Sequence, residues 1–131
     1  MATNYEKVRD YIMELDYSII HEDPEEEIFV VDHEEDGIKN LVIGIADPLL
    51  IIEQFMFDIK NESNMIYKDL LMKNRDIVHG AFVLDDSGTK VIFRDTLQIE
   101  NLDLNELEAS VTSLSLLLTE YSESLIEFSK N

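Results

Sequence analysis

The residues of this sequence that could hold a metal ion gather in the acidic segment HEDPEEEIFVVDHEEDG, residues 21–37. Four of them match positions one, three, five and six of a calcium-binding loop: Asp32, Glu34, Asp36 and Gly37. The twelfth position of such a loop requires a bidentate glutamate, and here it is Ile43. The flanking residues also have the pattern of strands, whereas such a loop joins two helices. We therefore predict no metal site and no cofactor and interpret the segment as a charged, solvated hairpin, with cation binding kept as an open alternative.

The histidines are the next candidates for chemistry, and they are His21, His33 and His79. None belongs to an HExxH motif or to another spaced set of metal ligands. His79 could be a catalytic base on a flexible joint with Gly80, but it also stands where the last hairpin begins. We interpret it as a strand-entry residue that makes a backbone hydrogen bond. The sequence has no cysteine, no P-loop and no G-x-S-x-G or G-x-G-x-x-G motif, so we predict no catalytic residue, no small-molecule substrate and no enzymatic activity.

The net charge of −19, from 29 acidic and 10 basic residues among 131, argues against two classes of partner. A surface this negative repels the phosphates of nucleic acids and of anionic membranes. It could steer a basic partner toward the chain, although simple solvation explains it as well. The absence of cysteine fits a reducing compartment, and residues 1–17 carry charge throughout without the apolar core of a signal peptide. We therefore predict a cytoplasmic protein that contacts neither membranes nor nucleic acid.

Hydrophobic periodicity predicts one α+β domain that spans residues 1–131. Apolar residues at helical spacing indicate helices over residues 5–15 and 62–74 and a final helix from Asp103, whose Asp-x-x-Glu start resembles a capping box. Strand patterns separated by turns lie at residues 17–22, 28–33, 38–46, 49–57, 80–86 and 90–95. The predicted fold is a twisted antiparallel sheet packed against helices, in the order α-β-β-β-β-α-β-β-α.

The strand pattern LLIIEQFMF, residues 49–57, is apolar on both faces of the sheet. One face is expected to carry Leu49, Ile51, Phe55 and Phe57, and the other Leu50, Ile52 and Met56. The helices can cover one face, and the other then needs another chain, although thick cover within the chain is an alternative. Two leucines of the last helix also lie off its apolar seam. The predicted partner or dimer surface is Leu50, Ile52, Phe55, Met56, Phe57, Leu116 and Leu117.

The apolar seam of the last helix is unusually long for a domain of this size. Its members follow a strict 3-4 alternation and are Leu104, Leu107, Val111, Leu114, Leu118, Tyr121, Leu125 and Phe128. At 1.5 Å per residue such a helix spans roughly 40 Å, whereas a strand of five or six residues spans about 17–20 Å. The helix is therefore predicted to overhang its sheet, to bend, or to pack on a second subunit.

The sequence from residue 66 onward contains an ordered set of structural motifs. A helix ending in Leu-Leu-x-x-Asn is formed by Leu70, Leu71 and Asn74. An apolar strand of Ala-Phe-x-Leu-Asp type follows at residues 81–85, then a glycine turn at Gly88 and a leucine-rich stretch that leads into the last helix. These motifs resemble the C-terminal half of the type III secretion chaperone-like superfamily, in particular its YbjN branch. The N-terminal half agrees with that superfamily in the order of its elements.

The resemblance implies a small, acidic, cytoplasmic and non-enzymatic protein that forms a homodimer. Secretion chaperones of this fold hold an extended segment of a client on apolar patches of helix and sheet. YbjN-like members are described instead as regulatory or stress-linked. We therefore predict a non-catalytic, chaperone-like module that binds an extended or amphipathic segment of a client polypeptide. The alternative is an acidic regulator or adaptor that docks a basic partner.

Overall fold

A computed structural model of the protein describes residues 3–60, 64–120 and 122. Its elements follow one another in the predicted order, so the predicted α+β class is confirmed. The helices are α1 (Asn4–Glu14), α2 (Asn64–Asn74) and α3 (Leu104–Glu120), with a single 3-10 turn, η1 (Glu34–Asp36). The strands are β1 (Ser18–Asp23), β2 (Ile28–His33), β3 (Ile38–Ala46), β4 (Leu49–Asp58), β5 (Ala81–Leu84) and β6 (Lys90–Gln98).

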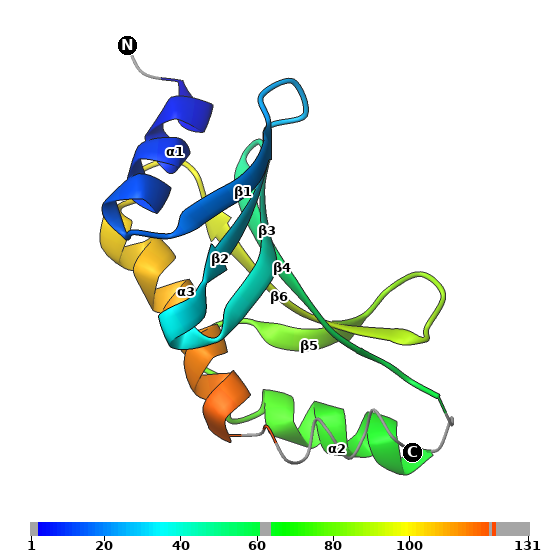
Figure 1. Ribbon diagram of the computed structural model, residues 1–131. Helices are drawn as coiled ribbons and strands as arrows, with labels where there is room; N and C mark the ends of the chain where they lie inside the picture. The colour runs from blue at the N-terminus through cyan, green and yellow to red at the C-terminus, as the bar shows by residue number, and fades with distance from the viewer. Residues whose placement is uncertain (1–2, 61–63, 121, 123–131) are drawn as a thin grey trace.

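The six strands form one antiparallel sheet in the order β1-β2-β3-β4-β6-β5. The sheet is strongly twisted, with α1 and α3 beside the β1–β3 part and α2 beneath the β5 end (Figure 1). Cross-strand pairs point to the same face, and the pairs of Phe29 with Ile43 and of Ile43 with Ile52 place three fully buried side chains on one face. We call this the covered face and the opposite one the open face.

Helices α1 and α3 are held on the covered face by apolar packing and by a few hydrogen bonds. Val8 and Ile12 of α1 are buried, and so are Leu107, Val111 and Leu114 of α3. The Tyr11 hydroxyl donates to the Leu102 carbonyl at 3.1 Å, and the Ser110 hydroxyl donates to Asp95 Oδ2 at 2.7 Å. The second bond ties α3 to β6, because Asp95 lies on the covered face opposite Ile52.

The start of each of these helices follows from a capping side chain. Thr3 and Glu6 form a reciprocal capping box at α1. At α3 the Glu106 N–H donates to Asp103 Oδ1 at 2.8 Å, which confirms the start predicted from the Asp-x-x-Glu sequence. The predicted seam residues Tyr121, Leu125 and Phe128 lie outside the described residues.

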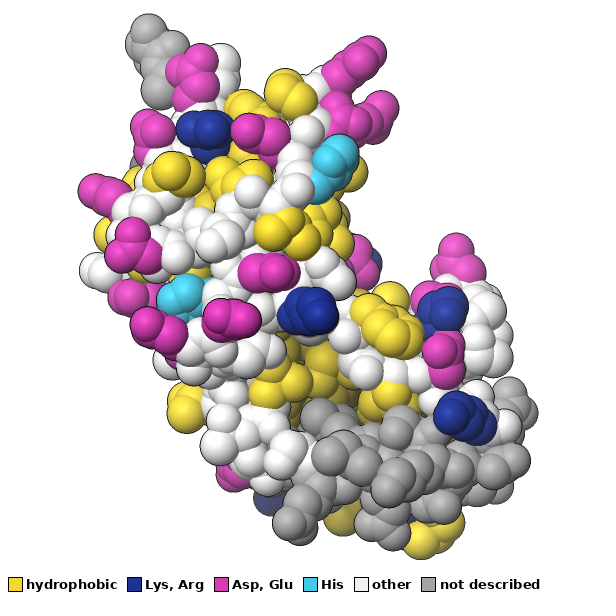
Figure 2. All heavy atoms as spheres, viewed as in Figure 1, with side chains coloured by type: hydrophobic (Ala, Val, Ile, Leu, Met, Phe, Trp, Pro, Cys, Tyr) yellow, Lys and Arg dark blue, Asp and Glu magenta, His cyan; other side chains and the backbone are white. Residues whose placement is uncertain are grey.

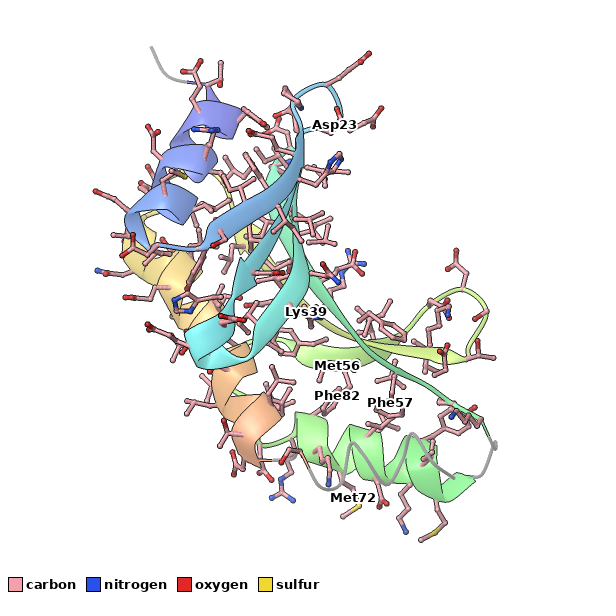
Figure 3. The ribbon with its side chains drawn as sticks, in the orientation of Figure 1. Asp23, Lys39, Met56, Phe57, Met72 and Phe82 are labelled. Carbon is pink, nitrogen blue, oxygen red and sulfur yellow. The ribbon has the colours of Figure 1, made fainter. Side chains whose placement is uncertain are left out.

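The facing of β4 differs from the prediction because the strand contains a bulge. Phe55 pairs with Ile92 while Phe57 pairs with Val91, so Met56 is an extra residue in the ladder. The bulge turns Phe57 onto the covered face, where it is only 6% exposed and points toward α2 together with Phe82 (Figure 3). The prediction that Phe57 shares a face with Leu49, Ile51 and Phe55 is therefore wrong.

One edge of the sheet is closed by a side chain instead of a strand. Asn74, the last residue of α2, donates from Nδ2 to the Phe82 carbonyl at 3.1 Å and accepts the Phe82 N–H on Oδ1 at 2.7 Å. These bonds occupy backbone groups of the edge strand β5 that would otherwise be open to pairing. They also fix the end of α2 against the sheet.

We expect the substitution Asn74→Ala to lower the free energy of unfolding by about 1–3 kcal/mol, because it leaves partly buried backbone groups of Phe82 without their partner. Urea unfolding would show this as a lower midpoint with an unchanged slope. The matched control is Asn105→Ala, an exposed asparagine of α3 that should shift the stability by no more than about 0.5 kcal/mol. Equal midpoints for the two variants would contradict the structural role of Asn74.

Candidate protein-binding surface

The open face of the sheet carries apolar side chains that no helix covers within the described part of the chain, because α1, α2 and α3 all pack on the covered face. Phe55 is 49% exposed, and Val42 and Leu49 are also exposed. The register places Phe55 beside Ile92 and Ile92 beside Val83, both half-buried. Figure 2 shows hydrophobic side chains on the sheet between the β1–β2 and β5–β6 hairpins. This row of exposed and half-buried apolar side chains is a candidate for contact with another protein.

The charged side chains around Phe55 are balanced in sign. Lys90 Nζ lies 2.8 Å from Asp58 Oδ1 and 5.4 Å from the centre of the Phe55 ring. The hydrogen bond that Lys90 donates to Asp58 raises the pKa of Lys90, so the lysine is charged at neutral pH. Glu53 and Arg94 form a further cross-strand pair of opposite charge. A partner can therefore approach the open face at this end without meeting a strong net charge.

The seven residues predicted for the partner surface are divided between surface and core. Phe55 and Leu116 are exposed, and Met56 is half-buried at the bulge. Leu50 and Ile52 are fully buried, so the prediction that they form surface is wrong: they lie on the face that α1 and α3 cover. Phe57 and Leu117 are also core residues, at 6% and 4% exposure.

Sequence reasoning missed part of the open face. Val42, Val83 and Ile92 were not among the predicted surface residues, yet they share this face with Phe55. Each lies in a short run of apolar residues, so its own strand does not tell which face it occupies. The missing information was the register between strands, since β4 pairs with β6 and not with the strand that follows it in the sequence.

Charge is distributed unevenly along the chain. Residues 59–94 contain six Lys or Arg and five Asp or Glu, a net charge of +1. The other residues contain four basic and twenty-four acidic side chains, a net charge of −20. Acidic side chains accordingly gather over α1 and the β1–β2 turn in Figure 2. The molecule thus has a strongly acidic part and a nearly neutral part.

A cluster at the acidic part joins α1 to β1. The Tyr5 hydroxyl donates to Glu22 Oε2 at 2.5 Å, and Arg9 Nε donates to the same oxygen at 3.1 Å. These two bonds hold the pKa of the Glu22 carboxyl below its usual range. Burial, and then the bond to Glu22, raise the pKa of Tyr5 to about 12. The ring of Tyr5 also stacks on the ring of Phe29, with 4.6 Å between the ring centroids. The cluster therefore holds α1 against the sheet.

Two carboxylates of the acidic segment considered for metal binding are engaged in local structure. Asp32 Oδ1 accepts the Asn40 N–H at 2.8 Å, and Asp36 Oδ2 lies 2.8 Å from His33 Nδ1. Within residues 3–60, 64–120 and 122, no three His, Asp or Glu side chains are placed to hold a metal ion. The His79 carbonyl accepts the Ser113 hydroxyl at 2.9 Å, which ties the β5 entry to α3.

No described helix is both long and apolar enough to cross a membrane. The geometry of the chain is instead that of a sheet with one helix-covered face and one apolar open face.

Solved structures of similar fold extend over nearly the whole chain. The crystal structure of YbjN from E. coli, described as a candidate transcription regulator, has a TM-score of 0.72 at 15% identity and covers 92% of each chain. The ExsC–ExsE complex has a TM-score of 0.67 at 17% identity, covering 95% of this chain and 97% of that one. The HopA1–SchA chaperone–effector complex has a TM-score of 0.66 at 11% identity, covering 91% and 94%. At these identities the likeness concerns the fold.

No curated protein matches the sequence closely enough to count as a relative. The family model CesT_Tir_1, a type III secretion chaperone family, matches residues 1–131. This match and the shared fold confirm the resemblance that the sequence motifs indicated, and membership in a chaperone family points away from enzymatic activity. The chain belongs to the CesT_Tir_1 family of type III secretion chaperones.

Proposed function

We propose that this protein is a non-catalytic, chaperone-like module that holds an extended or amphipathic segment of a client polypeptide on the open face of its sheet. The observation that carries the proposal is Phe55, an aromatic side chain 49% exposed in an apolar row on a sheet face that none of the described helices covers. Large aromatic side chains are the residues that most often dominate the free energy of binding at protein interfaces.

The family and the similar structures support the same function. Two of those structures are complexes in which a protein of this fold is bound to a second protein. One of them, the HopA1–SchA complex, joins a chaperone to its effector. The proposal includes a homodimer in the cytoplasm, which the family resemblance and the lack of cysteine support. Its domain organisation is one domain over residues 1–131.

We expect Phe55→Asp to abolish client capture or dimer formation without unfolding the chain, because a carboxylate would have to be desolvated in the middle of an apolar contact. The measurement is light scattering at micromolar concentration together with affinity capture from the native cell. The matched control is Met72→Asp, since Met72 is 61% exposed on the outer side of α2, away from the sheet (Figure 3). A Phe55→Asp variant that keeps both its mass in solution and its captured protein would contradict the proposal.

The acidic adaptor is a second candidate, and the uneven charge favours it. A net charge of −20 outside residues 59–94 could dock a basic partner without using the apolar row. Exposed charges are screened over about 8 Å at physiological ionic strength. Binding that collapses on added salt and ignores Phe55→Asp would favour the adaptor, whereas binding that resists salt and requires Phe55 would favour the client-holding function.

A further inference from the structure

A second apolar surface lies on the far side of α3 from the sheet. A groove of about 490 Å³ runs between α3 and the segment that joins α2 to β5. On α3 its lining extends from Asn105 to Glu120, which corresponds to about 22 Å along the helix axis at 1.5 Å per residue. Ser113, midway along this lining, donates to the His79 carbonyl at 2.9 Å and so ties the joining segment to α3. The groove is thus as long as four turns of helix and has a fixed wall.

Each of the two walls of the groove carries an exposed apolar side chain. Val78 is 85% exposed and Leu116 is 63% exposed, and they line the same groove from the two sides. Two small residues of α3, Ala109 and Ser113, also line the groove. Small side chains allow the backbone of a second helix to approach α3 closely. Leu116, which the sequence predicts to belong to a contact surface, lies in this groove.

The rim of the groove is acidic. Asp76, Glu108 and Glu120 contribute carboxylates, and none of the described residues that line the groove is a lysine or an arginine. Helices α1 and α3 of a second copy fit this rim poorly, because each carries more acidic than basic side chains. Helix α2, which carries Lys68 and Lys73, already packs Ile66 and Leu70 into the core of its own copy. The charge of the rim selects a partner that presents lysine or arginine on either side of an apolar stripe.

The backbone around the groove determines the conformation of that partner. The α3 backbone is hydrogen-bonded within the helix, and the His79 carbonyl is already occupied by Ser113. An extended strand in the groove would have no neighbouring strand with which to form backbone hydrogen bonds, whereas a helix satisfies its own backbone groups. We propose that the α3 groove binds a basic amphipathic helix of a partner protein. This site is separate from the open face, so it does not rest on the function proposed there.

The proposal is tested with a defined probe and the full-length chain. The probe is a fluorescein-labelled peptide of about 18 residues, long enough to form a helix, with alanine and leucine on one face and lysines on both flanks. Fluorescence anisotropy at physiological salt should show binding, and Leu116→Glu and Val78→Glu should each weaken it at least about tenfold. Both residues are largely exposed, so the variants should keep the wild-type urea midpoint.

Matched controls separate this site from the rest of the molecule. Met13→Glu changes an exposed apolar residue of α1, 53% exposed, and should leave the affinity unchanged. Phe55→Asp should also leave the affinity for the peptide unchanged, so the proposals for the groove and for the open face can be contradicted independently. A scrambled peptide of the same composition and a peptide with glutamates in place of the lysines should not bind. The proposal is overturned if the probe does not bind at millimolar concentration, if the scrambled peptide binds equally well, or if the groove variants bind like wild type.

Discussion

Replacing Gly80 with alanine is expected to lower the free energy of unfolding by about 2–5 kcal/mol, combining a backbone cost of roughly 1–2 kcal/mol with an overpacking cost of roughly 1–3 kcal/mol. Gly80 has φ +88°, a conformation that side chains other than glycine rarely adopt. A Cβ at this position would lie 2.4 Å from Cζ of the Phe93 ring and 3.1 Å from the Arg94 carbonyl oxygen. Phe93 is fully buried, so the ring cannot move aside without disturbing the core.

Gly88→Ala is the matched control for this variant. Gly88 also has a positive φ, +74°, but a Cβ there would meet nothing within 4 Å. Only the backbone cost of about 1–2 kcal/mol then applies. Urea unfolding of both variants measures the difference between them. Equal losses of stability would show that the close approach of β6 to Gly80 does not exist.

The second large effect is expected from Ile52→Ala, which should lower the free energy of unfolding by about 2–5 kcal/mol. Ile52 is fully buried on the covered face, opposite Ile43 on one side and Asp95 on the other. Removing its side chain leaves a cavity beneath α1 and α3 that the packed sheet cannot fill.

Phe55→Ala, three residues along the same strand, is the control for Ile52→Ala. Phe55 is 49% exposed, so its truncation should change the stability by less than about 1 kcal/mol. Thermal or urea unfolding of both variants checks which face of β4 the helices cover. If Phe55→Ala proved the more destabilising of the two, the assignment of the covered and open faces would be wrong.

The helices and strands could be predicted from the sequence because each has a strong local signal. The 3-4 spacing of apolar residues and the Asp103 cap define α3, and alternation between turns defines the hairpin that contains Phe82 and Phe93. The motif Leu70, Leu71 and Asn74 also indicated the family. Such signals depend on neighbours within a few residues, and the sequence contains those neighbours directly.

The facing of the central strand could not be predicted in the same way. LLIIEQFMF is apolar on both faces, so periodicity alone does not tell which side the helices cover. The bulge at Met56 then reverses the facing of Phe57, and bulges have no clear signal in a single strand. The bond between Asn74 and Phe82 joins residues of two different elements, and the groove along α3 joins segments about 30 residues apart, so both depend on how the folded chain places these elements.

The central claim is that the open face of the sheet is the surface that holds another protein. Its most direct test is photo-cross-linking in the native cell from a photoreactive phenylalanine analogue placed at position 55, with the same analogue at Met72 as the matched control. The account predicts adducts with a second polypeptide from position 55 and none from position 72. A folded protein that gives no adduct at position 55, or equal adducts at both positions, would contradict it.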